Sequence, residues 1–252
     1  MKLPDYTTAK NRTEKNNNII TYDIEKDLIG KYQGKKFFLK TYGCQMNEHD
    51  SEALRAMLIE LGFSETDDYE NCDLILLNTC SIRENAHNKA FGMLGRIKHL
   101  KQTKKDLLVG ICGCMAQEKV VVDEILKKYK HVNFVFGTHN IDHLPRLVDK
   151  AYNSGKQEIE VYSEELDLVE DMPAKRDTTY KAYVNIIYGC DKFCTYCIVP
   201  FTRGRQRSRT REYILKEVNN LIKDGYKEIT LPGQMLMPME KTYMMIMVLA
   251  NY

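Results

Sequence analysis

The stretch Tyr188-Gly-Cys-Asp-Lys-Phe-Cys-Thr-Tyr-Cys197 carries three cysteines within ten residues. Their C-x3-C-x2-C spacing allows three thiolates of one loop to face a common metal centre. Zinc sites usually take four ligands in two separated pairs, and nothing here supplies the second pair. Three protein ligands with one coordination position left open suit an iron–sulfur cluster. A buried or zinc-bound group of cysteines remains the alternative for Cys190, Cys194 and Cys197.

The residues on both sides of this loop predict the beginning of a (β/α) barrel. The apolar run Lys181–Tyr188 indicates a strand that leads into the loop. Arg211–Asp224 carries apolar residues at helical spacing and is followed by Gly225, and Glu228–Leu231 indicates the next strand. A complete barrel takes about 250 residues, so this part of the chain has room only for its first strands.

Upstream of the loop, strands and helices alternate. Short apolar runs typical of buried strands are separated by segments whose apolar residues recur every three or four positions, as in helices. This order predicts an α/β fold, a parallel sheet with helices on its faces. The predicted strands are 37–42, 72–78, 106–112 and 132–136, and the predicted helices are 50–61, 83–101, 118–128 and 141–152.

A second group of three cysteines follows the predicted strands. Cys44, Cys80 and Cys114 each lie one to three residues beyond a strand end, at separations of 36 and 34 residues. Binding sites form beyond the carboxyl ends of parallel strands, so we predict a second iron–sulfur cluster there. The alternative is that each cysteine is an independent loop residue. Cys72 and Cys112 fall at the edge of or within apolar runs and are predicted core residues, although Cys112 could replace Cys114 as a ligand.

Composition narrows the class of protein. The chain has 252 residues, enough for one or two domains, and its net charge of +2 does not by itself indicate a nucleic-acid partner. Eight cysteines are too few for a disulfide scaffold, and the polar start of the chain offers no apolar signal segment. We therefore expect a cytoplasmic protein in which clustered thiols bind metal. No apolar run approaches the length of a membrane span.

The pattern divides the chain into four segments. Residues 1–35 are polar and are predicted to be a flexible N-terminal extension, and residues 36–152 form the predicted α/β domain. Residues 153–178 are rich in acidic residues and are predicted to be a linker with one short strand, Glu158–Tyr162. Residues 179–252 form the predicted second domain, a truncated barrel.

Four separated motifs surround the two groups of cysteines. They are Thr41-Tyr-Gly-Cys-Gln-Met-Asn47 followed by Asp50-Ser-Glu52, then Asn78-Thr-Cys-Ser-Ile-Arg-Glu84, Gly113-Cys-Met-Ala-Gln117 and the segment Tyr188–Gly204. Together they resemble the motifs of the radical S-adenosylmethionine (SAM) methylthiotransferases. The resemblance extends from about Lys36 to Gln234.

This resemblance implies two [4Fe–4S] clusters and SAM as cofactors. It implies that Tyr196 contacts the SAM adenine and that Gln234 is a cofactor-binding residue. One cluster would cleave SAM, and the auxiliary cluster would handle the sulfur. The implied ligands are Cys190, Cys194 and Cys197 for the first cluster, and Cys44, Cys80 and Cys114 for the auxiliary cluster.

Within the family, the first motif is most similar to the branch that acts on isopentenyladenosine in tRNA. The implied reaction adds a methylthio group at C2 of N6-isopentenyladenosine 37. That carbon carries an inert C–H bond which no side-chain base can usefully deprotonate, so the cofactor would carry the difficult step. The implied partners are tRNA and an electron donor such as flavodoxin or ferredoxin, with no membrane, and we expect a monomer whose sulfur donor is unknown.

Two alternative functions stay open at this point. One is a methylthiotransferase that acts on threonylcarbamoyladenosine in tRNA or on a ribosomal protein. The other is a non-catalytic iron–sulfur or zinc module that binds RNA.

Four arginines, Arg203, Arg205, Arg207 and Arg209, occupy every second position after the cysteine loop. In an extended segment they would project to one face. We expect that face to contact SAM or the phosphates of tRNA, the alternative being a solvated loop. The family usually has glutamate where Gln206 stands, so any contact made by that glutamate is lost or remade here.

After Gln234 the chain departs from the family pattern. Residues 235–252 are rich in methionine, whereas the family continues with an Asn-Val-Asn-like turn and most of a barrel. Methionine has the single codon ATG, and a shift of one base can convert this segment into Asn-Val-Asn-Ala-Tyr-Gly-Lys-Asp-Leu-Tyr. We therefore predict a frameshift near Gln234 and an aberrant tail, which would make the chain an inactive fragment. The nucleotide sequence of the gene decides this directly.

Overall fold

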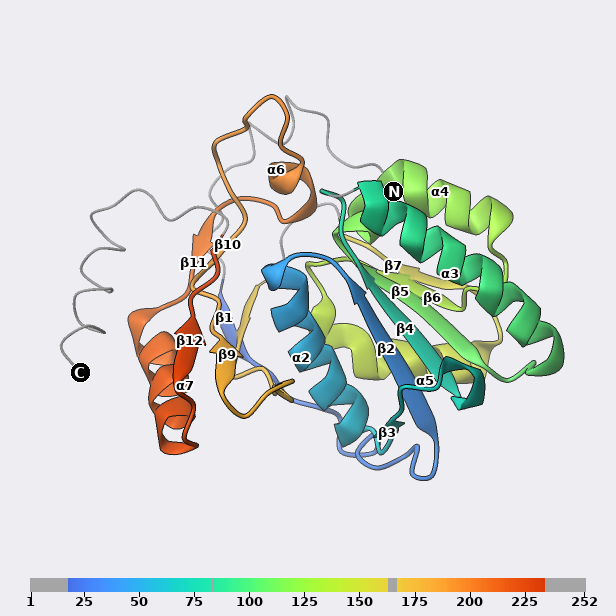
Figure 1. Ribbon diagram of the computed structural model, residues 1–252, viewed down its shortest axis with the longest axis horizontal. Helices are drawn as coiled ribbons and strands as arrows, with labels where there is room; N and C mark the ends of the chain where they lie inside the picture. The colour runs from blue at the N-terminus through green and yellow to red at the C-terminus, as the bar shows by residue number, and fades with distance from the viewer. Residues whose placement is uncertain (1–17, 83, 163–166, 234–252) are drawn as a thin grey trace.

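The centre of the structure, a computed structural model that describes residues 18–82, 84–162 and 167–233, is a parallel sheet of six strands. The strand order is β3-β2-β4-β5-β6-β7 (Figure 1). The predicted α/β fold is thereby confirmed. The strands are β2 (Lys36–Tyr42), β3 (Ser64–Glu65), β4 (Leu74–Thr79), β5 (Leu108–Gly113), β6 (Phe134–Phe136) and β7 (Glu158–Glu160).

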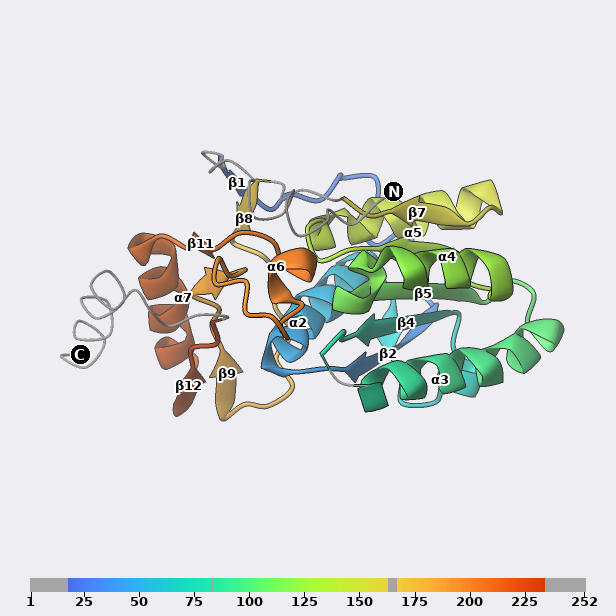
Figure 2. The ribbon, with the colours of Figure 1, turned by 90° about the horizontal axis from the view of Figure 1, so that it is seen from above.

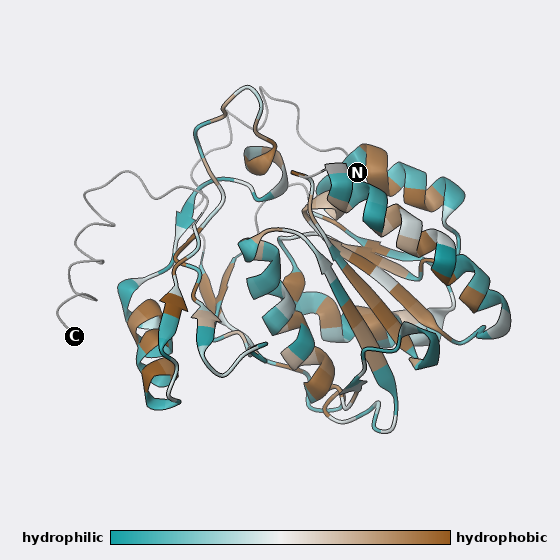
Figure 3. Cartoon of the chain, in the orientation of Figure 1, coloured by the Kyte–Doolittle hydropathy of each residue, from teal (hydrophilic) through white to brown (hydrophobic). Residues whose placement is uncertain are grey.

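Helices cover both faces of this sheet. On one face Leu54 and Leu147 belong to the same buried cluster as Phe134, and on the other Leu94 and Ile125 pack into a second cluster. Because both faces are covered, the central strands are buried along their whole length and are mainly apolar, as Figure 3 shows. The helices on the first face are α2 (Gln45–Glu60) and α5 (Leu144–Ser154), and those on the second are α3 (Glu84–Thr103) and α4 (Lys119–Lys128).

Helix α2 begins earlier than its apolar pattern predicts. The expected start was residue 50, and the helix starts at Gln45, directly after Cys44. Its first turns carry polar residues such as Asn47 and Ser51, which are completely buried against the ends of neighbouring strands. An apolar stripe cannot reveal a helical turn whose buried side chains are polar.

The prediction of a flexible extension over residues 1–35 is wrong for the part that the structure describes. Strand β1 (Ile19–Thr21) pairs in parallel with β8 (Leu168–Glu170). Further along, Leu28 and Tyr32 are buried in the core beneath α2 and α5. The ring of Tyr32 stacks on Phe63 and Tyr152, with centroids 5.0 and 4.8 Å away. Isolated apolar residues that do not recur at helix or strand spacing cannot predict such packing. Residues 1–17 lie outside the described part.

The predicted linker over residues 153–178 contributes to both halves of the molecule. Strand β7 pairs in parallel with β6 and completes the main sheet, so the sheet extends beyond residue 152. Strand β8 binds the N-terminal strand β1. The segment is short of apolar residues because its strands lie at sheet edges.

A smaller unit lies beside the main sheet (Figures 1 and 2). Strands β9 (Lys181–Tyr183) and β12 (Glu228–Thr230) pair in parallel, and α7 (Arg211–Lys223) packs on them through Ile214, Val218 and Leu221. This is the strand–helix–strand order expected for the start of a barrel. The predicted strand 181–188 is divided, because after β9 the backbone changes partner and β10 (Ile187–Tyr188) pairs antiparallel with β11 (Arg207–Ser208). The predicted tail, 235–252, and Gln234 lie outside the described residues.

The burial of Tyr32 gives a test of the N-terminal packing. We expect Tyr32→Ala to lower the free energy of unfolding by about 3–5 kcal/mol, because a large buried ring is removed. Tyr32→Phe should cost only about 1 kcal/mol, since it loses the hydrogen bond to Asp149 at 2.7 Å and keeps the ring. Urea denaturation measures both values. Tyr180→Ala, at an exposed tyrosine, is the control and should change stability by less than about 0.5 kcal/mol. A Tyr32→Ala variant as stable as this control would show that the segment is not part of the core.

Candidate functional site

Three parallel strands end at the same level and bring the upstream cysteines together. Tyr42 pairs with Thr79, and Thr79 with Gly113, so the carboxyl ends of β2, β4 and β5 are in register. Cys80 and Cys114 follow Thr79 and Gly113 directly. Cys44 lies two residues beyond Tyr42, at the N-cap of α2. The three loops converge as predicted.

The three thiols lie within interaction range of each other. The neighbouring Cys80 thiol lowers the pKa of Cys44 below its ordinary value, against the opposing effect of burial. The Cys44 thiol and burial raise the pKa of Cys80. Burial also raises the pKa of Cys114, although the positive charge of Arg203 opposes it. Soft metals and iron–sulfur clusters bind thiolates, so three neighbouring thiols are chemically suited to such a site.

Polar residues of the same motifs hold the loops in place. The Asn47 side chain donates to the Asn78 side chain and to the Thr79 carbonyl, each at 3.0 Å. Asn78 in turn donates to the Asn47 carbonyl and to the Ser51 hydroxyl, each at 2.9 Å. Asn47, Asn78 and Ser51 have no exposed surface. These side chains lock α2 to the end of β4, so their role is to fix the spacing of the cysteines.

Gly113 allows the third loop to approach the second. Its φ of +91° lies in the region that L side chains rarely adopt. A Cβ at this position would also lie 2.3 Å from the Thr79 carbonyl oxygen. Only glycine therefore fits between the end of β5 and the end of β4.

The downstream cysteines occupy a looser loop. Cys190 is buried, Cys197 is half-buried and Cys194 is exposed. The Cys190 amide donates to the Gly204 carbonyl at 3.1 Å, and the Cys197 amide donates to the Cys194 carbonyl at 2.9 Å. Tyr196, predicted to contact SAM, has 90% of its surface exposed. The loop is therefore anchored at its start and open at its tip.

Neither group of cysteines has the geometry of a site for one metal ion. Among the residues that the structure describes, no three His, Cys, Asp or Glu side chains are arranged around a single ion. In a [4Fe–4S] cluster the cysteines ligate different irons, so its ligands need not converge on one point. Three thiols at one sheet edge, held by a polar lattice, fit such a cluster.

The four arginines do not form one exposed strip, and that prediction is wrong. The extended segment is only β11, and Arg203 instead ends the short helix α6 (Val199–Thr202). Arg203 and Arg209 are buried in ion pairs, whereas Arg205 pairs with Asp191 of the cysteine loop at 2.9 Å. Arg207 lines a cavity of about 80 Å³. Spacing alone cannot show which arginines meet carboxylates from distant segments.

Arg203 reaches the upstream cysteines, which sequence reasoning missed. Its Nε donates to the Cys114 Sγ at 3.2 Å, and its Nη2 lies 2.7 Å from Asp50 Oδ2. Arg203 and Asp50 are each about 4% exposed at the side chain. The only signal in the sequence was that both residues fall inside the family motifs.

A chain of alternating charges joins the small unit to the main sheet. Glu217 of α7 contacts Arg176 and Arg209, each at 2.7 Å. Arg176 also forms an ion pair with Glu52 of α2, and Arg209 forms one with Glu170 of β8. Both arginines are less than 10% exposed. This network fixes how the cysteine loop is presented to the sheet edge.

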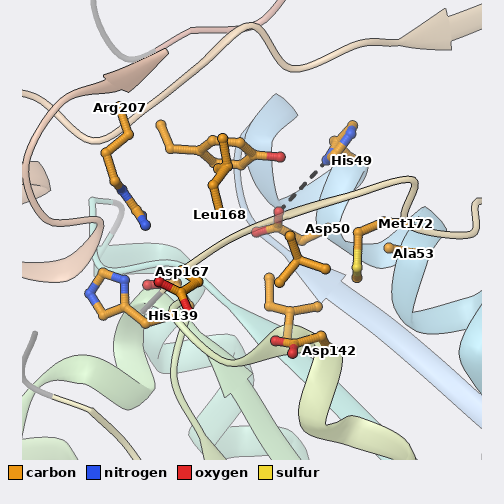
Figure 4. Close-up of a pocket in the computed structure, with 13 residues that line it drawn as sticks. His49, Asp50, Ala53, His139, Asp142, Asp167, Leu168, Met172 and Arg207 are labelled. Carbon is orange, nitrogen blue, oxygen red and sulfur yellow. Dashed lines mark ion pairs between the residues drawn. The ribbon is translucent and has the colours of Figure 1, made fainter. Parts of the chain in front are cut away.

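The cavity that Arg207 lines lies between the two units (Figure 4). His49 and His139 face it from the main domain, and Tyr188 and Arg207 face it from the small unit. A neighbouring cavity of about 450 Å³ shares His49 and Tyr188. His49 forms the contact marked in Figure 4 with Asp50, at 3.8 Å. The interface therefore holds space beside the Asp50–Arg203 pair.

Comparison with family profiles finds two matches. Residues 36–137 match the uncharacterized protein family UPF0004, and residues 184–248 match the radical SAM superfamily. These matches contain the two groups of cysteines, one each. The second match runs past Gln234, so it does not mark that residue as the end of the family pattern.

Comparison with curated proteins and solved structures agrees with these matches. The chain is 54% identical over 213 residues to tRNA-2-methylthio-N(6)-dimethylallyladenosine synthase of Staphylococcus epidermidis, covering 84% of this chain and 41% of the relative. It is 51% identical over 235 residues to the protein of that name from Staphylococcus aureus, covering 92% of this chain and 45% of the relative. In fold it is similar to the radical SAM methyltransferase TsrM of Kitasatospora setae, with a TM-score of 0.58, 12% identity, and coverage of 86% of this chain and 51% of that one.

A parallel α/β domain is followed by a radical SAM segment, and each contains one of the two groups of three cysteines. This combination defines a radical SAM protein with a second thiol centre. The chain belongs to the radical SAM methylthiotransferase family. It spans less than half the length of the curated relatives it matches. None of the helices in the described part of the chain is long and apolar enough to cross a membrane.

The charge network gives a prediction about stability and pH. Glu217→Gln should lower the free energy of unfolding at pH 7 by about 3–5 kcal/mol, because Arg176 and Arg209 stay charged and lose a buried partner. Although burial opposes it, the arginines and His49 hold the pKa of Glu217 below its ordinary value of 4.5. The stabilisation is therefore complete above about pH 5 and is lost as the pH falls through the lowered pKa.

Chemical denaturation at pH 7 and below pH 4 tests this expectation. The difference between the wild type and Glu217→Gln should shrink on acidification, because the protonated glutamic acid then resembles glutamine. Glu124→Gln removes an exposed pair with Lys128 and serves as the control, with an expected loss of about 0.5 kcal/mol. A Glu217→Gln effect as small as this control, or one that does not change with pH, would contradict the role given to the network.

Proposed function

We propose that the chain is the cluster-binding part of a tRNA methylthiotransferase that adds a methylthio group at C2 of N6-isopentenyladenosine 37. The observation that carries the proposal is the joining of two cysteine triads in one molecule, one at a sheet edge and one on the adjoining loop. Support for the substrate comes from the relatives, which are named as synthases of that modified nucleoside in tRNA.

Each triad would hold one [4Fe–4S] cluster, and SAM would bind at the cluster of the downstream loop. There, the bound cluster and SAM would supply the one-electron chemistry that activates an inert C–H bond. The downstream ligands would be Cys190, Cys194 and Cys197, with Tyr196 against SAM, and the auxiliary ligands would be Cys44, Cys80 and Cys114.

The chain's own residues would position these groups. The asparagine lattice of Asn47 and Asn78 would hold the auxiliary ligands at fixed spacing. The network of ion pairs around Glu217 would fix the orientation of the loop that carries Cys190, Cys194 and Cys197. Burial of the sheet edge would keep water away from the auxiliary cluster, because Cys80 has no exposed surface.

The partners follow from this chemistry. The substrate would be a tRNA, as the names of the relatives indicate. An electron donor such as a flavodoxin or ferredoxin would reduce the SAM-binding cluster. The protein would work in the cytoplasm, as a monomer.

Anaerobic reconstitution with iron and sulfide tests the proposal. We expect about eight irons per chain, as two [4Fe–4S] clusters require. Replacing Cys44, Cys80 and Cys114 together by alanine should leave about four irons, and the matching replacement of Cys190, Cys194 and Cys197 should also leave about four.

The control is Cys72→Ala. Cys72 is buried and belongs to neither triad. Its thiol donates a hydrogen bond to the Tyr69 carbonyl at 3.2 Å. Its iron content should equal that of the wild type. Tight zinc binding without the visible absorbance of iron–sulfur clusters would instead support a zinc module and overturn the proposal.

A further inference from the structure

Arg203 connects the two cysteine triads. It follows Cys197 by six residues and ends α6, yet its guanidinium lies in the upstream triad, where Nε donates to Cys114 Sγ at 3.2 Å. The other arm of the guanidinium pairs with Asp50 of α2 at 2.7 Å. Cys114, Asp50 and Arg203 are each less than 5% exposed. A cation from the SAM-binding segment is thus buried against a sulfur of the other site.

The backbone that carries Arg203 is fixed to the sheet domain. The Thr138 hydroxyl donates to the Thr202 carbonyl at 2.5 Å, and the Arg203 amide donates to the Val199 carbonyl at 2.8 Å. Thr202 is 1% exposed. The guanidinium therefore meets Cys114 from a rigid support, and its planar fork can contact the sulfur and the carboxylate together.

We propose that Arg203 is a positioning residue that sets the reduction potential of the auxiliary cluster, and that Asp50 moderates its effect. The inference rests on the proposed function, because it assumes that Cys114 ligates a [4Fe–4S] cluster. Hydrogen bonds to the ligand sulfurs and the local charge are among the factors that determine such potentials.

The direction of the effect follows from charge. A reduced cluster carries one more negative charge than an oxidised one, so a cation that donates to its ligand sulfur favours the reduced state and raises the potential. Burial leaves this interaction weakly screened by solvent and salt. Asp50 opposes the cation from the other side. Arg203 and Asp50 must therefore shift the potential in opposite directions when their charges are removed.

The experiment uses the full chain with Cys190, Cys194 and Cys197 replaced by alanine, so that only the auxiliary cluster is measured. After anaerobic reconstitution, its midpoint potential is followed by a redox titration with electron paramagnetic resonance. Arg203→Gln should make the potential more negative, by about a tenfold change in the reduction equilibrium or 59 mV for one electron. Asp50→Asn should make it more positive. Arg146→Gln, at an exposed pair with Glu160, should not change it.

Opposite shifts support the inference, since a general loosening of the site would move both variants the same way. Shifts of the same sign, or potentials equal to that of the parent, would overturn it. Arg203→Lys retains a charge but cannot contact Asp50 and Cys114 together, and it should give a smaller shift of the same sign as Arg203→Gln.

The parent separates this inference from the proposed function. If the parent binds about four irons and both Arg203 variants fold without binding any, Arg203 serves assembly rather than potential, and the inference is wrong. A parent that binds no iron–sulfur cluster would overturn the proposed function, and the inference with it.

Discussion

The level carboxyl edge of β2, β4 and β5 is the constraint on which the site depends. The register Tyr42–Thr79–Gly113 makes three loops leave the sheet at one height, and each loop presents a cysteine within two residues. A slip of one residue in a strand would turn its side chains to the opposite face and remove its cysteine from the group. The missing side chain of Gly113 and the buried pair Asn47–Asn78 then set how closely the loops approach.

The two units are joined by charges rather than by a shared apolar core. The apolar cluster of the small unit, built around Ile214 and Val218, is separate from the two clusters of the main sheet. Buried ion pairs lose much of their attraction to desolvation, so they add little stability over an apolar contact. They do require each partner to occupy one position. The alternating chain of charges from Glu52 to Glu170 therefore specifies how the two units dock.

The sequence was sufficient for the elements with continuous or periodic apolar patterns. The predicted strands 37–42, 72–78, 106–112 and 132–136 all contain or overlap an observed strand, because parallel strands buried on both faces are apolar over most of their length. Cys112 was rightly assigned to the core, where it packs in the cluster beneath α2. The strands β1 and β8 were missed, because an edge strand needs few apolar residues. The strand β7 was predicted at 158–162, but it was assigned to a linker rather than to the main sheet.

The predicted site failed where it depended on pairs of residues distant in the sequence. The spacing of the four arginines suggested one face, but Arg203 and Arg209 are directed inward by Asp50, Glu170 and Glu217, which belong to three other segments. A single sequence shows that a buried charge needs a partner, and it does not show which partner lies beside it.

The two triads differ in how far the protein has organised them before a metal binds. Cys80 and Cys114 are buried at the sheet edge that the hydrogen-bonded pair Asn47–Asn78 holds in place, whereas Cys194 and Tyr196 are exposed at the tip of a loop. Metal affinity includes the cost of ordering the ligands, so the sheet-edge site is the better prepared of the two. Helix α6 follows Cys197 by two residues, and Arg203, directly after the helix, contacts Cys114 of the other triad. Arg203 is held in place by Cys114 and Asp50 of the sheet domain. Because Arg203 comes six residues after Cys197, these contacts also fix one end of the loop that carries Cys190, Cys194 and Cys197.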